Sequence, residues 1–308
     1  MIKQIKYQDI TWLDIESPTK TDLDSLIKDF DIHPIVVQDL NSPSMRSKVD
    51  VYDNFIYLVL HFPVTGGRSR ADTEADDSIE VDFVLGKDFI ITTHYENVDS
   101  LSEFSKIFEA NGTLSKAKSK MHAGHIFYYI IRQLYQSLEQ HLESVNHNLK
   151  RSEKSIFSGK EIETVKTLSV INRNLIDFRW ALKYHREVLN SLELACKDFY
   201  GPKFEYHINS IIGEYEKIWN ILDSNRETFN DLRRTNDSLL AIKTSEAIKS
   251  LTAIAFFTFT ISTLAAIFGM NMKHNPFNDF PYDFWVMIAI MGIITFGVFI
   301  AFRKRKWL

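Results

Sequence analysis

The sequence predicts an α+β membrane protein, in which a cytoplasmic α/β domain leads through a long helical stalk into the first of two transmembrane helices. Three observations support this fold class. Near the end of the 308-residue chain, two runs contain no Asp, Glu, Lys or Arg, from Ser250 to Asn271 and from Phe284 to Phe302. The residues before these runs carry nearly all of the charge. Strand and helix patterns alternate over residues 1–115, and only helical patterns follow.

Residues 1–115 are predicted to form the α/β domain. An alternating pattern over residues 1–10 and apolar runs at 9–15, 51–62, 79–85 and 89–94 indicate strands. Helical spacing of apolar residues indicates helices at 19–30 and 33–40, and a further helix that begins at Asp99. Gly86-Lys87-Asp88 signals a hairpin between the last two strands, and the polar residues 65–77 are predicted to be a loop.

Residues 116–202 are predicted to form long antiparallel helices. The first runs over 122–157 and ends at Ser158-Gly159. The second runs over 161–199 and ends at Tyr200-Gly201-Pro202, where the glycine stops one helix and the proline can start another. Because only a few residues join the two helices, they must lie side by side in opposite directions.

Residues 203–248 are predicted to be a stalk helix. Between Lys203 and Phe268 there is no proline and a single glycine, Gly213. One helix of about 65 residues would be close to 100 Å long. Its apolar residues follow a heptad spacing, which predicts self-association of parallel copies, or alternatively packing on the chain's own helices. The seam consists of Ile208, Ile211, Tyr215, Ile218, Leu222, Phe229, Leu232 and Leu239, with Asn225 and Asn236 at the two missing steps.

Residues 249–308 are predicted to form two transmembrane helices joined by a short external loop. The two uncharged runs are 22 and 19 residues long, close to the roughly 20 helical residues that cross a bilayer. Basic residues flank both runs, at Lys243 and Lys249 and at residues 303–306, whereas the loop has only Lys273. The positive-inside rule therefore predicts a multi-pass protein of the cell (inner) membrane with both termini in the cytoplasm.

Composition excludes several classes of protein. The net charge of −4 and the pI near 6.2 give no sign of nucleic-acid binding. A single cysteine, Cys196, rules out an internal disulfide. The first residues lack the apolar core of a signal peptide. We find no nucleophile–base pair, closed metal cluster or phosphate-binding loop, so we expect neither an enzyme nor ATP coupling, and no cofactor.

The first membrane run carries its small and hydroxyl residues on one face. They recur at steps of three, four or seven, which brings them together on a helix. Such a face packs against a neighbouring helix in many membrane proteins. Alternatively, several copies of the face surround a water-filled path, which hydroxyl, backbone and apolar groups would line. The face consists of Ser245, Thr252, Ala255, Phe259, Ser262 and Ala266.

Motifs over the whole chain resemble the CorA family of divalent-cation channels. Gly269-Met270-Asn271 matches the signature loop of that family between the same two helices, and Lys306-Trp307-Leu308 matches its common ending. The N-terminal part resembles the cytoplasmic domain of the family. The matching residues there are Trp12-Leu13-Asp14, His33-Pro34 followed by Asp39, Arg46 and Lys48, and Leu85-Gly86-Lys87.

The resemblance implies a homopentamer in the lipid bilayer, with one central pore that the first membrane helix lines. The pore-lining residues would be Ser245, Thr252, Phe259, Ser262 and Ala266. A ring of Asn271 side chains at the outer mouth would receive hydrated Mg²⁺ through water, because Mg²⁺ dehydrates reluctantly and keeps several waters. Gly269 would let the chain leave the helix, and Met270 would support the loop by packing. The expected activity is passive, potential-driven Mg²⁺ uptake, with Co²⁺ and Ni²⁺ as further ions.

The chain departs from the family pattern in several places. Lys273 follows the signature loop, where an acidic residue is usual, and Phe259-Thr260 stands where a methionine and a proline are common. Five phenylalanines would make an apolar constriction that closes by dewetting. The family also implies that cytoplasmic Mg²⁺ is a regulatory ion. Asp99 lies at a matching place for sensing it, whereas Ser210 replaces the expected acidic partner.

Two alternative functions remain open at this point. One is a Zn²⁺ transporter of the same architecture, although such relatives tend to vary the position of Met270. The other is a membrane-anchored sensor or scaffold that conducts nothing, which the Phe259 ring and Lys273 would favour. His122 and His125 have the spacing of a zinc or nickel pair, but without a third ligand nearby in sequence we interpret them as residues of a helix surface.

Overall fold

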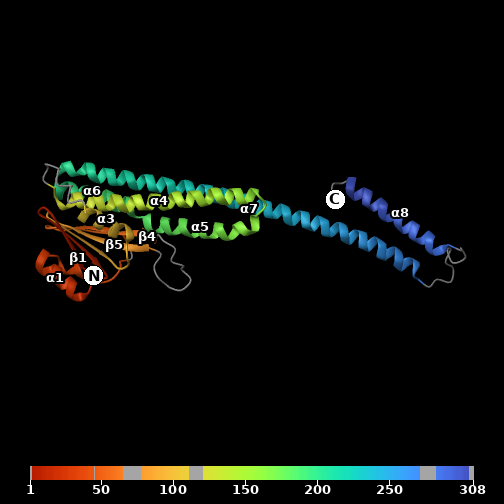
Figure 1. Cartoon of the computed structure of the whole chain (residues 1–308), viewed down its shortest axis with the longest axis horizontal. Helices are drawn as coiled ribbons and strands as arrows, with labels where there is room; N and C mark the ends of the chain where they lie inside the picture. Colours follow the sequence, from red (N-terminus) through yellow and green to blue (C-terminus); the bar gives the residue numbers. More distant parts are fainter. Residues whose placement is uncertain (1, 45, 65–77, 111–120, 271–281, 305–308) are drawn as a thin grey trace. The chain divides into compact units, whose positions relative to one another are not determined.

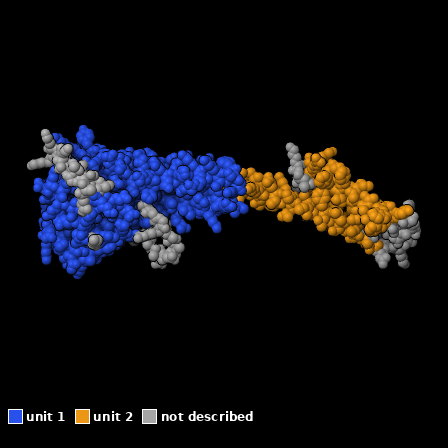
Figure 2. All heavy atoms as spheres, viewed as in Figure 1, with its two compact units in different colours: residues 1–232 blue, residues 233–308 orange. Residues whose placement is uncertain are grey.

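The computed structural model describes residues 2–44, 46–64, 78–110, 121–270 and 282–304. The chain divides into two compact units, Met1–Leu232 and Arg233–Leu308 (Figure 2). The first contains a mixed sheet and most of the helical residues, and the second contains the apolar helices. The segment boundaries at residues 115, 202 and 248 stay predictions.

A mixed sheet organises the first unit. In the part of the chain that the structure describes, its strand order is β1-β2-β6-β5-β4-β3. The labels of β1, β4 and β5 locate the sheet in Figure 1. Only β2 and β6 pair in parallel, and the other neighbours are antiparallel. The strands are β1 (Ile2–Tyr7), β2 (Ile10–Glu16), β3 (Lys48–Val51), β4 (Ile56–Pro63), β5 (Ser78–Leu85) and β6 (Phe89–His94).

The hairpin between β5 and β6 is confirmed, and the strand predicted at 51–62 is wrong in one respect. The Gly86 N–H donates to the carbonyl of Phe89 at 2.9 Å, and a side chain on Gly86 would overlap the Phe89 ring. Residues 51–62 form the end of β3 and most of β4, because Asp53 and Asn54 turn the chain between them. The Tyr52 N–H donates to the Phe55 carbonyl at 2.9 Å and closes this turn.

Short helices cover one face of the sheet. α1 (Lys20–Phe30) and α2 (Pro34–Asp39) form where helices were predicted. Thr19 caps α1 in a reciprocal arrangement with Asp22, as its sequence pattern favours. Both helices contribute to one apolar core with the strands. Its fully or nearly fully buried residues are Ile15, Leu23, Leu26, Ile32, Val36, Leu40, Phe55, Tyr57, Val59, Val84 and Ile91.

Other helices cover the opposite face. α3 (Asp99–Ala110) begins where it was predicted, and its Phe104 ring lies 5.6 Å from Trp12 on β2. The Phe127 ring of α4 (Ala123–Phe157) lies 5.3 Å from Phe83 on β5. The sheet is therefore sandwiched between α1 and α2 on one side and α3 and α4 on the other.

The single helix predicted at 161–199 is wrong, because the structure has α5 (Glu161–Leu182) and α6 (His185–Tyr200). The Tyr215 hydroxyl donates to the Leu182 carbonyl at 3.4 Å and accepts a hydrogen bond from the backbone of Arg186. In a continuous helix those two backbone groups would bond to each other. A hydroxyl inserted between them breaks the helix without a glycine or proline.

The stalk seam packs within the chain as far as Leu232. α7 (Glu205–Phe268) is a single helix of 64 residues, and its seam residues from Ile208 to Leu232 are buried. Asn225 accepts a hydrogen bond from Asn146 on α4 and donates one to the Leu142 carbonyl, both at 3.0 Å. Self-association through this stretch was therefore a wrong prediction, and the alternative of packing on the chain's own helices holds.

Candidate functional site

Two helices of the second unit have the length and composition of membrane spans. The apolar part of α7 has a mean hydropathy of 1.8, and α8 (Asp283–Lys304) reaches 2.5. Almost none of either apolar window is buried within the chain. A core helix of a soluble protein would be mostly buried, so the exposure of these apolar side chains fits lipid or neighbouring subunits.

α8 packs on one face of the apolar part of α7. The ring of Phe302 lies 5.5 Å from Phe256, and the ring of Phe299 lies 6.3 Å from Phe257. Ala253, between Phe256 and the start of the apolar run, is only 1% exposed. This contact defines which face of α7 is already occupied within a single chain.

The predicted pore-lining residues lie on a different face of α7. At about 100° per residue, their centre is about 120° around the helix from the face that contacts α8. Phe259 is 70% exposed. Ser245, Ser262 and Ala266 are exposed as well, and Thr252 is half-buried. Within a single chain, α8 therefore leaves most of this face uncovered. Whether the face packs on a helix of another copy or surrounds a pore stays a prediction.

Hydroxyl groups on α7 donate to their own helix. The Thr252 hydroxyl donates to the Ile248 carbonyl at 2.7 Å, and Thr260 donates to Phe256 at 2.8 Å. A hydroxyl has one proton and two lone pairs, so a back-bonded threonine presents only acceptor oxygen to its surroundings. Thr252 thus offers lone pairs on the face with Phe259, which suits a cation or the protons of its hydration water.

The signature motif begins directly after α7. The Gly269 N–H donates to Ala265 at 2.9 Å and the Met270 N–H to Ile267 at 3.3 Å, so helical hydrogen bonding continues to this point. A side chain on Gly269 would lie 3.2 Å from the Ala265 carbonyl, which favours glycine. Met270 is 57% exposed in a single chain. Its packing under the loop stays a prediction, because the loop lies outside the described residues. Asn271 lies outside the described residues, as do Lys273 and residues 305–308.

Asp99, the candidate magnesium-sensing residue, begins α3 at the surface. Its Oδ1 accepts a hydrogen bond from the Asn97 side chain at 3.1 Å. Ser210, the residue at the corresponding stalk position, contacts the Tyr128 hydroxyl at 3.4 Å. No group of three or more His, Cys, Asp or Glu side chains is arranged to hold a metal ion anywhere in the described ranges. Asp99 alone therefore makes no closed metal site within one chain.

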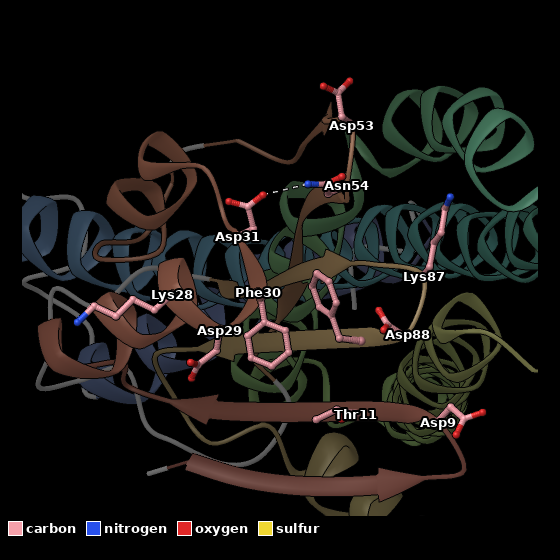
Figure 3. A pocket seen from close by; sticks show the side chains of 11 residues that line it. Asp9, Thr11, Lys28, Asp29, Phe30, Asp31, Asp53, Asn54, Lys87 and Asp88 are labelled. Carbon is pink, nitrogen blue, oxygen red and sulfur yellow. Dashed lines mark hydrogen bonds between the residues drawn. The ribbon is translucent and has the colours of Figure 1, made fainter.

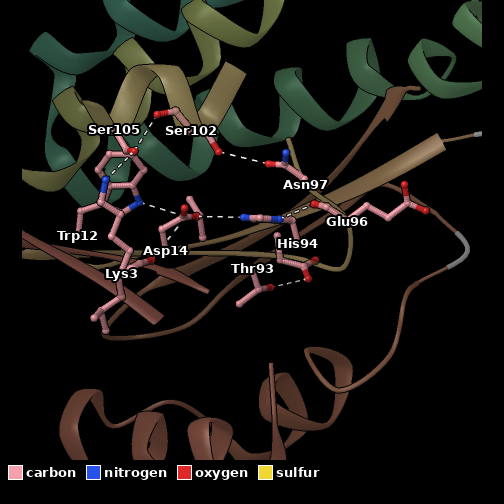
Figure 4. A network of polar contacts seen from close by, with 12 residues as sticks. Lys3, Trp12, Asp14, Thr93, His94, Glu96, Asn97, Ser102 and Ser105 are labelled. Carbon is pink, nitrogen blue, oxygen red and sulfur yellow. Dashed lines mark hydrogen bonds and ion pairs between the residues drawn. The ribbon is translucent and has the colours of Figure 1, made fainter. Parts of the chain in front are cut away.

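A polar network includes residues of the segment that leads to Asp99 (Figure 4). The Trp12 indole donates to Thr92 at 3.1 Å, and Thr92 donates to Asp14 at 2.5 Å. His94 Nε2 lies 3.4 Å from the same Asp14 oxygen, and His94 Nδ1 donates to the Glu96 carbonyl at 2.6 Å. The network therefore fixes the backbone just before Asn97 and Asp99. Sequence reasoning missed it, because the partners meet only through the parallel pairing of β2 and β6.

A second polar group within the sheet joins two carboxyls of β5. Glu80 is 5% exposed and Asp82 is fully buried. Burial and the neighbouring Glu80 charge raise the pKa of Asp82 well above its ordinary value, which favours the protonated carboxyl. The Ser44 N–H donates to Glu80 at 2.5 Å. The Thr93 hydroxyl donates to Asp82 at 2.9 Å. An acidic pair in an apolar strand is the signal that could have revealed it.

An acidic pocket of about 490 Å³ opens beside β6 and α1 (Figure 3). Asp31 accepts a hydrogen bond from Asn54 at 3.1 Å, and the other lining carboxylates point in different directions. The pocket also holds two lysines, so opposite charges share it. The absence of a metal-binding group among the described residues applies here too. Its lining consists of Asp9, Thr11, Lys28, Asp29, Phe30, Asp31, Asp53, Asn54, Lys87, Asp88 and Phe89.

Known proteins match this chain over nearly its whole length. The family model described as "CorA-like Mg2+ transporter protein" matches residues 7–304. The cobalt/magnesium transport protein CorA of Thermotoga maritima is 25% identical over 299 residues, which cover 97% of this chain and 83% of that protein. The complete structure of the CorA magnesium transporter from Methanocaldococcus jannaschii has a TM-score of 0.81 at 18% identity, over 99% of this chain and 94% of that one. The full-length CmaX protein has a TM-score of 0.73 at 15% identity, over 97% and 89% of the two chains. The predicted fold class is confirmed.

Proposed function

The chain belongs to the family of CorA-like Mg²⁺ transporter proteins, and on this premise we propose that it is one subunit of a homopentameric channel for passive Mg²⁺ uptake. The two CorA proteins named above are described as transport proteins. The proposed activity needs no catalytic residue and no cofactor, because Mg²⁺ is the cargo. Co²⁺ and Ni²⁺ are proposed as further ions.

The observation that carries this proposal is the face of α7 that α8 leaves free. Four of its five predicted pore-lining residues are exposed in a single chain, although they lie in a helix that is apolar enough to cross a membrane. Small and hydroxyl side chains gain little from contact with lipid, whereas around a shared axis they allow close approach of helices and contact with water. Several copies of α7 with Ser245, Thr252, Ser262 and Ala266 turned to such an axis would form a narrow pore.

The entrance is proposed to be a ring of Asn271 amides. Asn271 follows Met270, the point at which the helical hydrogen bonding of α7 ends. Amide oxygens can accept hydrogen bonds from the waters of hydrated Mg²⁺ without removing them. A ring of carboxylates would attract the ion more strongly but release it more slowly, and conduction requires exit as well as entry.

The membrane potential supplies the driving force in this proposal. Moving a divalent cation inward through 100 mV is favourable by about 4.6 kcal/mol, twice the value of about 2.3 for one elementary charge. Arg303 and Lys304 end α8, and Lys243 and Lys249 precede the first apolar run. These basic flanks support an inner-membrane orientation with both termini in the cytoplasm.

Cytoplasmic Mg²⁺ is proposed to regulate the channel through Asp99. The Asp99 carboxylate is exposed, and its described hydrogen-bond partner is Asn97. It would therefore need ligands from a neighbouring subunit or water, which suits a weak site that senses the cytoplasmic concentration. Mg²⁺ keeps several waters in such sites.

The purified protein in liposomes with a magnesium-sensitive dye tests the proposal. Mg²⁺ influx that follows an imposed potential supports a channel, and native mass spectrometry of the same particle tests the pentamer. Influx that requires a proton gradient, or that occurs only with Zn²⁺, would instead support a zinc transporter. A protein that passes none of these ions would be a sensor or scaffold.

A further inference from the structure

Three histidines gather where the two longest helices begin. His122 is the N-cap of α4 and His125 is the third residue of that helix. His207 is the third residue of α7. The ring centroids of His122 and His125 are 4.1 Å apart, and those of His125 and His207 are 5.1 Å apart. The first two were expected on a helix surface, but they are half-buried, and α7 brings the third. We call these three residues the histidine cluster.

Aromatic rings enclose the histidine cluster. The His122 ring stacks on Tyr200 of α6 at 4.3 Å, and the His207 ring stacks on Phe204 at 5.1 Å. The Nδ1 atoms of His122 and His207 are buried, and neither has a hydrogen-bond partner in the described part of the chain. A buried nitrogen without a partner is costly, and most such groups have one. The cluster therefore joins α4, α6 and α7 at a cost in folding stability.

The surroundings of all three histidines favour the neutral ring. Burial and the neighbouring His125 and His207 lower the pKa of His122 to about 4. Burial also lowers the pKa of His125, with a contribution from His207, and burial alone lowers that of His207. Each residue lies in the first turn of a helix or caps it, where the helix dipole places about half a positive charge and disfavours an imidazolium.

The packed elements offer no spare carboxylate to the histidine cluster among the described residues near it. Glu205 pairs with Lys197 at 3.3 Å. The Lys87 carbonyl accepts a hydrogen bond from the Ala123 N–H at 3.1 Å, and the Lys87 ammonium lies over the Phe199 ring. Two titratable side chains contact the rings of the cluster: Tyr200 on α6 stacks on His122, and Tyr128 on α4 lies edge to face with His207 at 5.1 Å. The charged residues close to the cluster in sequence are Lys197, Lys203 and Glu205.

The ligand that this arrangement suits is the proton rather than a metal ion. The rings stack on aromatic side chains instead of directing three nitrogens at one point, and none of the described His, Cys, Asp and Glu residues form a group of three that could hold a metal. A proton needs only one nitrogen, and the buried Nδ1 atoms of His122 and His207 are such sites.

We propose that the histidine cluster is a proton-operated latch, which holds the first turns of α4 and α7 together while neutral and releases them on acidification. A proton on one ring places a charge beside two other histidines and at the ends of two helices that are positive already. Water must then reach the ring, and the aromatic enclosure has to open. Because α7 continues into the apolar helix of the second unit, opening loosens the start of the helix that carries the candidate pore face.

The size of the effect follows from linkage. The opened latch binds more protons than the closed one, so the closed state is stable above pH 6.5 and weakens as the pH falls below it. With a pKa of about 4 for closed His122, lowering the pH from about 7.5 to about 5.5 favours opening by about tenfold from this residue alone. His125 and His207 act in the same direction.

Hydrogen exchange of the full-length protein in lipid nanodiscs tests the latch. Between pH 7.5 and 5.5, the protection factors of amides in the first turns of α4 and α7 should fall about tenfold. The measured rates are first corrected for the pH dependence of intrinsic amide exchange. A triple variant with His122→Gln, His125→Gln and His207→Gln should keep the same protection at both values. His147→Gln, on the exposed side of α4, should behave like the wild type.

Three outcomes would overturn the latch. The first is equal protection at both pH values in the wild type, and the second is the same loss in the triple variant. The third is tight binding of Zn²⁺ or Ni²⁺ at neutral pH that depends on these histidines, which would make the cluster a metal site. If the triple variant does not fold, NMR titration of the three histidine rings in the wild type tests the proposal instead. All three must become protonated only below pH 6.5, and a ring that titrates above this value would contradict the latch.

Discussion

His94 Nε2 lies 3.4 Å from Asp14 Oδ1, and this pair ties β6 to β2 where the chain leaves the sheet toward Asp99. His94 Nδ1 is hydrogen-bonded too, to the Glu96 carbonyl at 2.6 Å. Burial acts to lower the pKa of His94, but the hydrogen bond and charge of Asp14 outweigh it and raise the pKa. The buried His94–Asp14 pair, in which the raised pKa favours the protonated ring, thus anchors the segment that holds the candidate magnesium-sensing residue.

Replacing His94 tests this anchor. Because the folded pKa is raised, the pair stabilises the fold fully below pH 6.5, and its contribution disappears as the pH rises through the folded pKa. His94→Gln should therefore cost about 1–3 kcal/mol at pH 6 and less at pH 9. Unfolding midpoints of the full-length protein at the two pH values measure this. His147→Gln is the control, and an equal cost at both values would contradict a charged His94.

The carboxyl pair of β5 has its own pH dependence. The pKa of Asp82 is raised by burial and by Glu80, so the folded chain keeps a proton that the unfolded chain loses above pH 4. Stability contributed by this proton therefore falls as the pH rises. Asp82→Asn keeps a donor for Glu80 and cannot ionise, so it should be more stable than the wild type at pH 9 by about 1 kcal/mol or more. Unfolding midpoints from pH 5 to 9 test this, with Asp24→Asn as the control; parallel profiles would refute a raised pKa of Asp82.

Local signals predicted much of the fold. The β5–β6 hairpin follows from Gly86, whose missing side chain makes room for the Phe89 ring. α1 follows from the helical spacing of its apolar residues, and the structure adds a local cap of Thr19 and Asp22 at its start. The free face of α7 follows from the spacing of Thr252 and Phe259, because helical periodicity alone decides which residues share a side.

The features that sequence reasoning missed depend on residues far apart in the chain. Tyr215 breaks the helix at Leu182 with a hydroxyl that only the packing of α7 supplies. His207 reaches His125 because α4 and α7 begin at the same place. Pairs of this kind have no local pattern, and a single sequence gives no means to place one helix against another.

The proposed regulation predicts a change at Asp99. Asp99→Asn removes a charge that would hold a cytoplasmic cation, while its amide can still bond to Asn97. We expect inhibition of the magnesium current by cytoplasmic Mg²⁺ to need a concentration several-fold higher, with no change in the uninhibited current. Patch recordings with magnesium steps on the cytoplasmic side measure both quantities. Asp24→Asn, at an exposed position of α1, is the control. An unchanged inhibition curve would remove Asp99 from regulation.

The apolar constriction predicts a leak when its ring is removed. Phe259 is 70% exposed on the face that α8 leaves free, so five copies around an axis would close a pore by expelling water. Phe259→Ala widens this point and should raise Mg²⁺ flux several-fold under conditions in which the wild-type channel is shut. Phe296→Ala removes an equally exposed ring from α8 and should leave the closed-state flux unchanged. If both variants leak alike, the ring does not gate the pore.

Selectivity is the sharpest consequence of an asparagine ring. Hydrated Mg²⁺ would donate hydrogen bonds from its waters to the Asn271 oxygens, whereas a weakly hydrated monovalent cation gains less from the same ring. Asn271→Ala should therefore abolish the preference for Mg²⁺ over Na⁺ and K⁺ while the oligomer still assembles, because the helix contacts of α7 and α8 lie outside the loop. Liposome flux in mixed salts measures the preference, and native mass spectrometry checks assembly. Asn278→Ala changes another asparagine of the same connection and should keep the preference. A selective Asn271→Ala channel would mean that discrimination occurs deeper on α7, at oxygen ligands such as the back-bonded Thr252.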